Sequence, residues 1–523
     1  MLRNRLFAGA MLALTLSACG VNPVTGKREI QFVSEAQELK IGEQNYSPTR
    51  QAEGGDLTVM PELTTYVNEV GQKLAAVADR KLPYEFVVLN NSVPNAWALP
   101  GGKIAINRGL LTELKNEAEL AAVIGHEIVH AAARHGAKAQ ERGTLMQAGM
   151  AAAQIGAAIG GVDANVAGLA IQGAGVGAQM IQQKYGRDQE LESDEYGMKY
   201  MKLVGYDLTG AITLQETFVR LSQGNGAKEQ SWLEGLFASH PPSAERVEKN
   251  KQTAQQLGVG GELGQERYAA KTKTLRDTKP AYDKYDQALA AARKKDFSTA
   301  KSLANDAVKA LPREAKFHEL LGELALAEKQ PQAALPHYQK AIELNPNYFG
   351  SYLGAGVAQF QAGNKAKAEE WLTKSTQLLP TAPAAYYLGN VARERGDLKQ
   401  AMEHYRAAAT SNSQIGQLAA AEFVRMDLPT NPGNYVGTAG QFDPQGRPIL
   451  VIQNRAPVAL TNIQVTPVLV DASGRVLQQG APVRVGRTLK AGEQIAADAG
   501  LGALTQEQLP YLRFRVDGAR VAE

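Results

Sequence analysis

The spacing of apolar residues in the N-terminal half of the chain predicts a domain of mixed helix and strand. Apolar residues recur at helical spacing over 63–78, and a strongly apolar helical pattern covers 117–135. Between these helices, 84–89 is a short apolar run typical of strands, and 103–107 alternates in polarity after a Pro-Gly-Gly turn. We therefore expect a mainly α-helical domain with a small β-sheet over 56–265.

The region 280–428 carries an internal repeat. Prolines and small residues recur in it with a period of 34 residues: Pro312, Pro346 and Pro380; Ala288, Gly322 and Gly356. This period, with small residues where paired helices touch and proline at the turn, is typical of tetratricopeptide repeats. Each unit is a helix hairpin that cannot bury its apolar face alone, so about four repeats are expected to stack into an α-solenoid.

The last ninety or so residues change to short β-type runs separated by glycine-containing turns. The runs are 448–453, 463–470, 475–477, 483–485 and 511–516. This pattern predicts a small β-sandwich-like domain over 436–523. A chain of 523 residues is also too long for one hydrophobic core, so a multidomain protein is expected.

The first 19 residues resemble the leader of a bacterial lipoprotein. Arg3 and Arg5 precede 13 uncharged residues, which are too few to span a bilayer but fit a signal-peptide core. They end in Leu-Ser-Ala before Cys19, the only cysteine of the chain, and this ending is similar to a lipobox. We therefore predict a signal peptide at 1–18, acylation of Cys19, and a lipid-anchored tether and docking segment at 19–55.

The residue after the cysteine bears on location. In lipoproteins of this class an Asp there marks retention at the inner membrane, whereas this chain has Gly20. The resemblance therefore implies a periplasmic protein anchored to the outer membrane. The formal net charge is +3, and loss of Arg3 and Arg5 leaves about +1 (3 − 2), which gives no reason to expect nucleic acid as a partner.

Residues 143–183 are rich in Gly, Ala and Gln and carry a single charge. Their length allows two membrane spans, which would make the protein membrane-integral. Ala and Gly contribute little to insertion, however, and glutamine opposes it. We expect instead a buried or lid-forming pair of helices.

The candidate chemistry lies in the apolar helix 117–135. His126 and His130 differ by about 40° around a helix axis, so both imidazoles project from one face toward a single ion. Glu127 can reach the open position of that ion as a general base. Apolar flanking residues would bury the helix and keep the site dry, so a zinc site of the His-Glu-x-x-His type is predicted.

A catalytic zinc needs a third protein ligand and one open position. The acidic run 188–195 offers Glu190 and Asp194, which share a helix face by their spacing of four residues, while Glu192 points elsewhere. Helical spacing alone leaves the choice between Glu190 and Asp194 open.

Together these motifs resemble the HtpX and CAAX prenyl protease family of gluzincin peptidases, over about residues 20–255. The resemblance rests on four sequences: His-Glu-x-x-His at 126–130, Glu-x-x-x-Asp-x-x-Gly at 190–197, Asn-Ala-Trp-Ala-Leu-Pro-Gly-Gly at 95–102 and Ser-His-Pro-Pro at 239–242. It implies a zinc metalloendopeptidase with one Zn²⁺ per subunit. It also implies that the strand 103–107 is an edge strand that pairs with extended substrate.

Carried over to this sequence, the family pattern makes His126, His130 and Glu190 the zinc ligands. Glu127 becomes the catalytic base, and Asp194 lies behind the ligands or donates a proton near the site.

Three further residues carry hypotheses. His240 has three alternative roles. Its imidazole stabilises the tetrahedral intermediate, or it occupies the fourth position of zinc and thereby holds the enzyme inactive. In the third alternative, His240 is a structural histidine before a Pro-Pro turn. Arg246 is a candidate partner of the oxyanion. His135 lies off the ligand face and is expected to be a surface residue or to lie behind the ligands.

Two functions of different classes follow. The first is a zinc endopeptidase of the periplasm that acts in quality control of outer-membrane or envelope proteins. Its repeats would bind polypeptide substrates or the outer-membrane protein assembly machinery. The alternative is a chaperone or assembly scaffold with a latent peptidase domain. The intact set of predicted ligands and base favours the first, because a discarded site would be free to lose Glu127.

Overall fold

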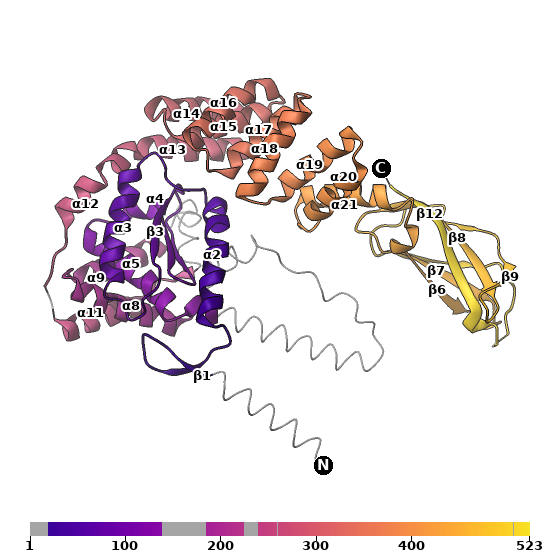
Figure 1. The fold of residues 1–523 in the computed structure, drawn as a ribbon, viewed down its shortest axis with the longest axis horizontal. Coiled ribbons are helices and arrows are strands. Elements are labelled where there is room, and N and C mark those ends of the chain that lie inside the picture. Colours follow the sequence, from indigo (N-terminus) through magenta and orange to yellow (C-terminus); the bar gives the residue numbers. More distant parts are fainter. Residues whose placement is uncertain (1–18, 139–184, 224–238, 259, 506, 523) are drawn as a thin grey trace, which may run out of the picture. The chain divides into compact units, whose positions relative to one another are not determined.

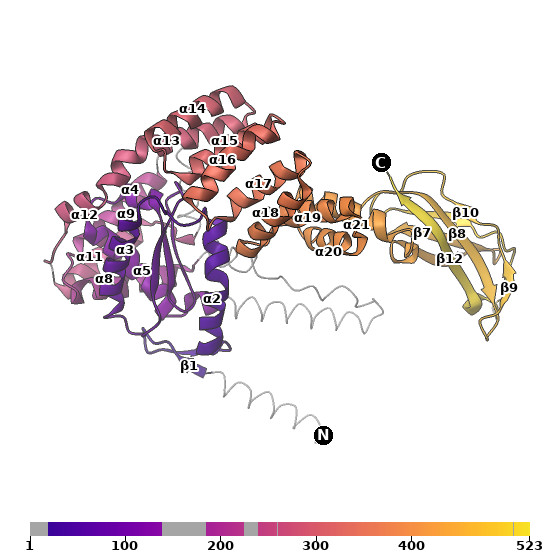
Figure 2. The ribbon, with the colours of Figure 1, turned by 45° about the horizontal axis from the view of Figure 1, so that its top comes forward.

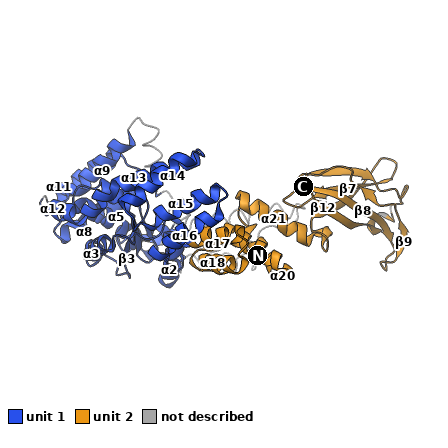
Figure 3. Ribbon diagram, turned by 90° about the horizontal axis from the view of Figure 1, so that it is seen from above, with its two compact units in different colours: residues 1–351 blue, residues 352–523 orange. Residues whose placement is uncertain are grey.

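The computed structural model describes residues 19–138, 185–223, 239–258, 260–505 and 507–522. It divides into two compact units, Met1–Ser351 and Tyr352–Glu523 (Figure 3). The predicted signal peptide and the segment 143–183 lie outside the described residues, so both stay predictions. Among the helices of the described ranges, none is long and apolar enough to cross a membrane.

A three-stranded sheet lies at the centre of the N-terminal part of unit 1 (Figure 1). β3 (Glu85–Leu89) runs parallel to β5 (Lys103–Asn107), and β4 (Ala96–Leu99) pairs with β5 in antiparallel register. The strand order is β3-β5-β4, so β5 is central and the prediction that it is an edge strand is wrong. The reason is the turn between β4 and β5, where Gly101 and Gly102 adopt φ of 80° and 83° and fold β4 back onto β5.

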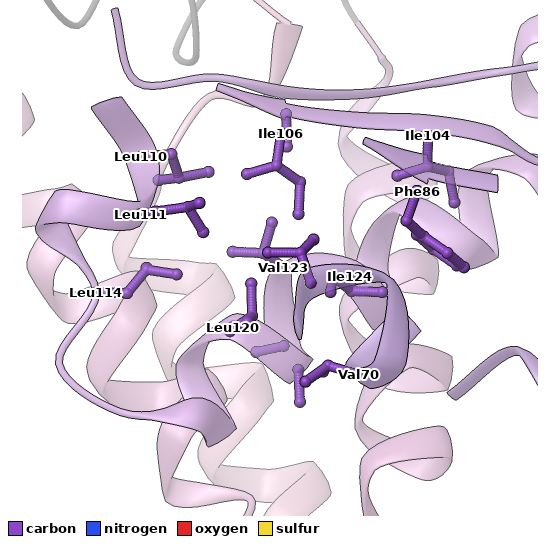
Figure 4. Close-up of a cluster of buried hydrophobic side chains, with 14 of the residues drawn as sticks. Val70, Phe86, Ile104, Ile106, Leu110, Leu111, Leu114, Leu120, Val123 and Ile124 are labelled. Carbon is purple, nitrogen blue, oxygen red and sulfur yellow. The ribbon is translucent and has the colours of Figure 1, made fainter. Parts of the chain in front are cut away.

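Among the helices that pack against this sheet, α3 (Pro61–Ala75) and α5 (Glu117–Ala132) share its main apolar core. All residues of β5 are buried, including the polar Lys103 and Asn107 at its two ends. Side chains of β3, β5, α3 and α5 form one continuous core, seen in Figure 4: Phe86, Ile104, Ile106, Val70, Leu120, Val123 and Ile124.

The helix α5 begins at a cap and ends at a break in the backbone. The side chain of Asn116 accepts a hydrogen bond from the backbone N–H of Glu119. The helix ends at Ala132, earlier than the pattern over 117–135 predicted, because Arg134 adopts a left-handed φ of 62°. Its guanidinium Nε donates to the buried carboxylate of Glu38 at 2.9 Å, which holds this conformation.

Three more helices complete the N-terminal core around α5: α8 (Arg187–Leu203), α9 (Thr209–Ser222) and α11 (Ala244–Leu257). The helices α5 and α8 approach closely at Gly125 and Gly197. A Cβ atom built on Gly197 would lie 3.0 Å from the carbonyl carbon of Gly125 and from the backbone nitrogen of His126. Two glycines therefore let α8 lie directly against the helix that carries the two histidines.

The segment after Cys19 packs onto this core. A hairpin of β1 (Cys19–Val21) and β2 (Arg28–Ile30) precedes α2 (Glu35–Ala52). The helix α2 starts with a capping box between Ser34 and Gln37. Arg80 binds Glu38 of α2 with both terminal nitrogens, at 2.8 and 3.0 Å. Two shorter helices, α4 (Arg108–Glu113) and α12 (Gln265–Lys271), join the N-terminal part of unit 1 to the repeats.

The first helix hairpins of the repeats belong to unit 1: α13 (Lys273–Arg293), α14 (Phe297–Ala310), α15 (Ala315–Ala327) and α16 (Pro331–Leu344). The missing side chain of Gly322 lets the ring of Tyr338 pack against α15, where a Cβ would lie 2.8 Å from it. Hydrogen bonds join these repeats to the N-terminal part of unit 1, from Asn90 to Glu314 at 2.9 Å and from Ser92 to Asp286 at 2.9 Å.

Unit 2 contains the later repeats and the C-terminal strands. Its helices are α17 (Phe349–Gln361), which begins at the boundary, α18 (Lys365–Leu378), α19 (Ala382–Arg395), α20 (Leu398–Ala408) and α21 (Gln414–Asp427). The predicted helical repeats are confirmed. Gly389 again lies against a tyrosine, Tyr405, as Gly322 does in unit 1.

The C-terminal domain consists of two small sheets around a shared apolar core, as predicted. One sheet has the order β11-β7-β6, and in the other β10, β8 and β12 lie side by side with β9 pairing to β8 (Figure 2). The strands are β6 (Val436–Phe442), β7 (Pro448–Asn454), β8 (Leu460–Val470), β9 (Val476–Gln479), β10 (Val483–Arg484), β11 (Gln494–Asp498) and β12 (Leu512–Val521). The apolar runs did not reveal β6 and β11, whose residues are mostly exposed or half-buried.

Candidate metal centre

The two histidines of α5 face one another across one turn of the helix. The Nε2 atoms of His126 and His130 lie 2.9 Å apart, and both side chains are buried. Burial lowers the pKa of His130 well below its ordinary value, so its imidazole is neutral and keeps a lone pair for a metal.

The helix α8 brings Glu190 to this pair. One carboxylate oxygen lies 3.3 Å from the Nε2 of His130, and the other lies 3.6 Å from the Nε2 of His126. Burial opposes ionisation of Glu190, but the neighbouring His240 and His126 lower its pKa well below the ordinary value. Of the two carboxylates that helical spacing left open, Glu190 is therefore the one placed among the ring nitrogens.

His240 joins the same cluster from the segment before α11. Its Nδ1 lies 3.2 Å from the Nε2 of His126 and 3.1 Å from a carboxylate oxygen of Glu190. Together His126, His130, Glu190 and His240 offer one ligand atom each within 4.8 Å of one another. Such a set of imidazoles and one carboxylate matches the ligands that zinc takes in proteins.

Glu127 lies beside the cluster, as a general base would. Its Oε1 is 3.5 Å from the Nε2 of His240, and its Oε2 is buried without a hydrogen-bond partner in the described part of the chain. Burial raises the pKa of Glu127, which suits a group that must take up a proton. A buried carboxylate oxygen without a partner also fits a site whose ion and water complete the hydrogen bonding.

Asp194 lies behind the cluster and orients one of its rings. Its carboxylate lies 2.8 Å from the Nδ1 of His126, so that ring donates there and turns its Nε2 toward the metal position. Arg246 donates two hydrogen bonds of 2.7 Å to Asp194, and its remaining terminal nitrogen lies 2.7 Å from Glu190. Burial opposes ionisation of Asp194, yet the Arg246 guanidinium lowers its pKa below the ordinary value.

The partners of Arg246 bear on its predicted role. Its guanidinium contacts Asp194, Glu190 and the backbone carbonyl of Pro241. These contacts hold two acidic side chains of α8 in place. A contact of Arg246 with the oxyanion stays a prediction.

An apolar pocket opens beside His126 and Glu127. Ala96 of the edge strand β4 is part of its lining. Side chains of α5, α8 and α9 form its apolar wall: Ala122, Val123, Met198, Met201, Leu214 and Phe218. This apolar recess therefore lies next to both β4 and the candidate metal ligands.

Two site residues were missed or misplaced by the sequence patterns. Tyr185 stacks on His130 with ring centroids 3.9 Å apart, and it lies at the end of a segment without a periodic pattern. His135 is 1% exposed and its Nδ1 lies 2.9 Å from the Nδ1 of His130, so the surface position is wrong and the position behind the ligands is right. The left-handed turn at Arg134 explains this, because it directs His135 back toward His130.

Comparison with known proteins identifies the family. Residues 61–254 match peptidase family M48, and 285–349 and 325–389 match tetratricopeptide repeat families. The beta-barrel assembly-enhancing protease of Escherichia coli (strain K12) is 25% identical over 480 residues, which cover 81% of this chain and 95% of that protein. A putative beta-barrel assembly-enhancing protease of Vibrio cholerae is 30% identical over 198 residues, 38% of this chain and 40% of that protein.

A smaller relative contains mainly the peptidase part. Metalloprotease YcaL of Escherichia coli (strain K12) is 30% identical over 187 residues, which cover 35% of this chain and 68% of that protein. The peptidase resemblance noted from the motifs is thereby confirmed. The chain belongs to peptidase family M48 and is a metallopeptidase with tetratricopeptide repeats after its catalytic domain.

Proposed function

We propose that the protein is a zinc-dependent endopeptidase of the bacterial periplasm that acts in quality control of outer-membrane or envelope proteins. One observation carries the enzymatic part of this proposal. Side chains from two helices far apart in sequence, His126 and His130 on α5 and Glu190 on α8, meet within ligand distance beside the buried Glu127. Family membership makes a metal-dependent peptidase the expected use of this arrangement.

The residues of the site have different roles in peptide hydrolysis. A bound zinc supplies Lewis acidity that activates water and polarises a peptide carbonyl. Glu127 takes the proton of the attacking water and passes it to the leaving amine nitrogen. Asp194 and Arg246 hold His126 and Glu190 in position, and the backbone of β4 binds the substrate as an added strand.

We also propose a resting state in which the enzyme is held inactive. His240 supports this, because its Nδ1 lies among the other three ligand atoms and can take the fourth zinc position. While an imidazole occupies that position, no water binds there. Cleavage then requires His240 to withdraw.

The location and partners are also proposals. The leader sequence supports acylation of Cys19 and anchoring to the outer membrane from the periplasmic side. The names of the similar enterobacterial and Vibrio proteins support a role in β-barrel assembly. We propose that the repeats bind polypeptide substrates or the assembly machinery, since tetratricopeptide solenoids present extended binding surfaces.

Replacing Glu127 by Gln tests the enzymatic function and separates it from the scaffold alternative. The purified Glu127→Gln protein should bind zinc as the wild type does, because the ligands are intact, but cleave an unfolded protein substrate about 10²–10⁴-fold more slowly. Chelation of zinc should abolish cleavage by the wild type. In cells that lack the native protein, Glu127→Gln should fail to restore envelope function, and full restoration would support the scaffold instead.

A further inference from the structure

Behind the candidate metal ligands lies a chain of polar side chains that the mechanism above does not use. The Nδ1 of His130 lies 2.9 Å from the Nδ1 of His135, and the Nε2 of His135 lies 3.3 Å from a carboxylate oxygen of Glu192. His135 is 1% exposed, so its ring nitrogens have no access to bulk water. Glu192 is the acidic residue of α8 whose helical position excludes it from the ligand set.

The order of these contacts fixes where each proton lies. An ionised carboxylate only accepts hydrogen bonds, so His135 must donate from Nε2 to Glu192 and is left with an accepting Nδ1. His130 must then donate from its own Nδ1, which leaves the lone pair of its Nε2 facing Glu190 and His126. This is the form of imidazole that binds a metal through Nε2.

We propose that Glu192 and His135 form a hydrogen-bond relay that positions His130 as a metal ligand. The inference rests on the proposed zinc site. With this relay, both candidate ligand histidines of α5 have a carboxylate behind them. Asp194 contacts His126 directly, and Glu192 reaches His130 through His135. Neither His135 nor Glu192 touches the substrate, so both are positioning residues.

The relay continues to the segment beside the predicted lipid anchor. Asn22, which is fully buried in the hairpin after Cys19, donates to the same Glu192 at 3.3 Å and to Glu29 at 3.2 Å. Lys138, just beyond His135, lies 2.6 Å from Glu29. The packing of the N-terminal hairpin therefore orients the outer end of the relay.

Zinc affinity tests the relay. The dissociation constant of zinc is measured by competition with a chelator of known affinity, on the purified full-length protein and its variants. His135→Phe keeps a ring but removes both nitrogens, and it should weaken zinc binding by about 10–100-fold. His135→Asn places an amide oxygen near the position of Nδ1 and should restore part of this loss. Asn22→Ala leaves His135 and Glu192 intact and should weaken binding less than His135→Phe does.

A pair of substitutions on α8 provides the matched comparison. Glu192→Gln should weaken zinc binding several-fold. Glu195→Gln removes an equal charge three residues away, where Glu195 is exposed and pairs with Lys199 at 2.7 Å, and should leave the affinity unchanged. The absorption spectrum of the cobalt-substituted protein should change with Glu192→Gln and not with Glu195→Gln.

The outcomes separate the relay from the zinc site itself. If wild type binds zinc and His126→Ala does not, but His135→Phe binds as tightly as wild type, the relay is wrong and the proposed function stands. If wild type binds no zinc, the proposed function fails first. Should His135→Phe unfold the protein, equal affinities of Glu192→Gln and Glu195→Gln overturn the relay.

Discussion

The contact between Gly125 and Gly197 leads to a quantitative prediction. A Cβ atom on Gly197 would lie 3.0 Å from two backbone atoms of α5, whereas ordinary contacts begin at 3.4 Å. Backbone atoms of a helix cannot rotate away as a side chain can. In Gly197→Ala the helices α5 and α8 must therefore separate by roughly 0.4 Å (3.4 − 3.0), the distance that restores normal van der Waals contact.

Two opposing energies set the size of the effect. Alanine favours the helix over glycine by about 1 kcal/mol. Forcing a methyl group into a close-packed contact costs about 1–3 kcal/mol. The net destabilisation of Gly197→Ala is then up to about 2 kcal/mol, and the same shift moves Glu190 away from His126 and His130. Because a site tolerates only about 0.5 Å of displacement, we expect zinc affinity to fall about 10-fold.

Thermal unfolding with and without zinc measures both effects. Gly136→Ala is the control, because Gly136 is also helical and its added Cβ would meet only Pro100 at 3.6 Å, an ordinary contact. It should raise the melting temperature slightly, while Gly197→Ala should lower it and reduce the stabilisation by zinc. If both variants raise the melting temperature and bind zinc equally, the close approach of the two helices does not set the ligand geometry.

Two further predictions concern the blocking histidine and a buried acid of the repeats. His240→Ala vacates the fourth zinc position and should raise the rate of proteolysis; a fall would favour a role in the transition state, and an unchanged rate would exclude both roles. Burial raises the pKa of Glu319 from its ordinary 4.5 to about 8. Because the folded protein binds this proton more tightly than the unfolded chain does, the contribution of Glu319 to the free energy of unfolding is complete below pH 4.5. This contribution is lost as the pH rises through about 8. Glu319→Gln should flatten this decline in melting temperature between those pH values, and an unchanged profile would show that Glu319 is not the cause.

Some features of the fold and of the site could be predicted from the sequence, because the spacing of residues within one helix or one repeat determines these features. The spacing of His126 and His130 is enough to put both rings on one face of a helix. The recurrence of Gly322 and its equivalents marks where helices of a repeat pack on aromatic rings. Such features depend on local geometry, which spacing along the chain encodes.

Other features depend on contacts between distant segments. The ion pair with Glu38 stabilises the left-handed Arg134, and so no pattern in 117–135 reveals that the helix stops before His135. The central place of β5 follows from its pairing with β4 after the Gly101–Gly102 turn and with β3 on its other side, which the alternation of 103–107 does not encode. Helical spacing predicts only that Glu192 lies off the face of Glu190 and Asp194, and its contact with His135 depends on the packing of α8 on α5.

The four residues of β4 limit what the proposed enzyme can select. A strand of this length spans about 13 Å, so added-strand pairing engages only about four residues of another chain. Those bonds go to main-chain groups, which every polypeptide has but which native proteins keep occupied in their own helices and sheets. The proposed enzyme would then distinguish chiefly unfolded from folded proteins. A correctly assembled membrane or envelope protein would escape cleavage without needing any protective sequence.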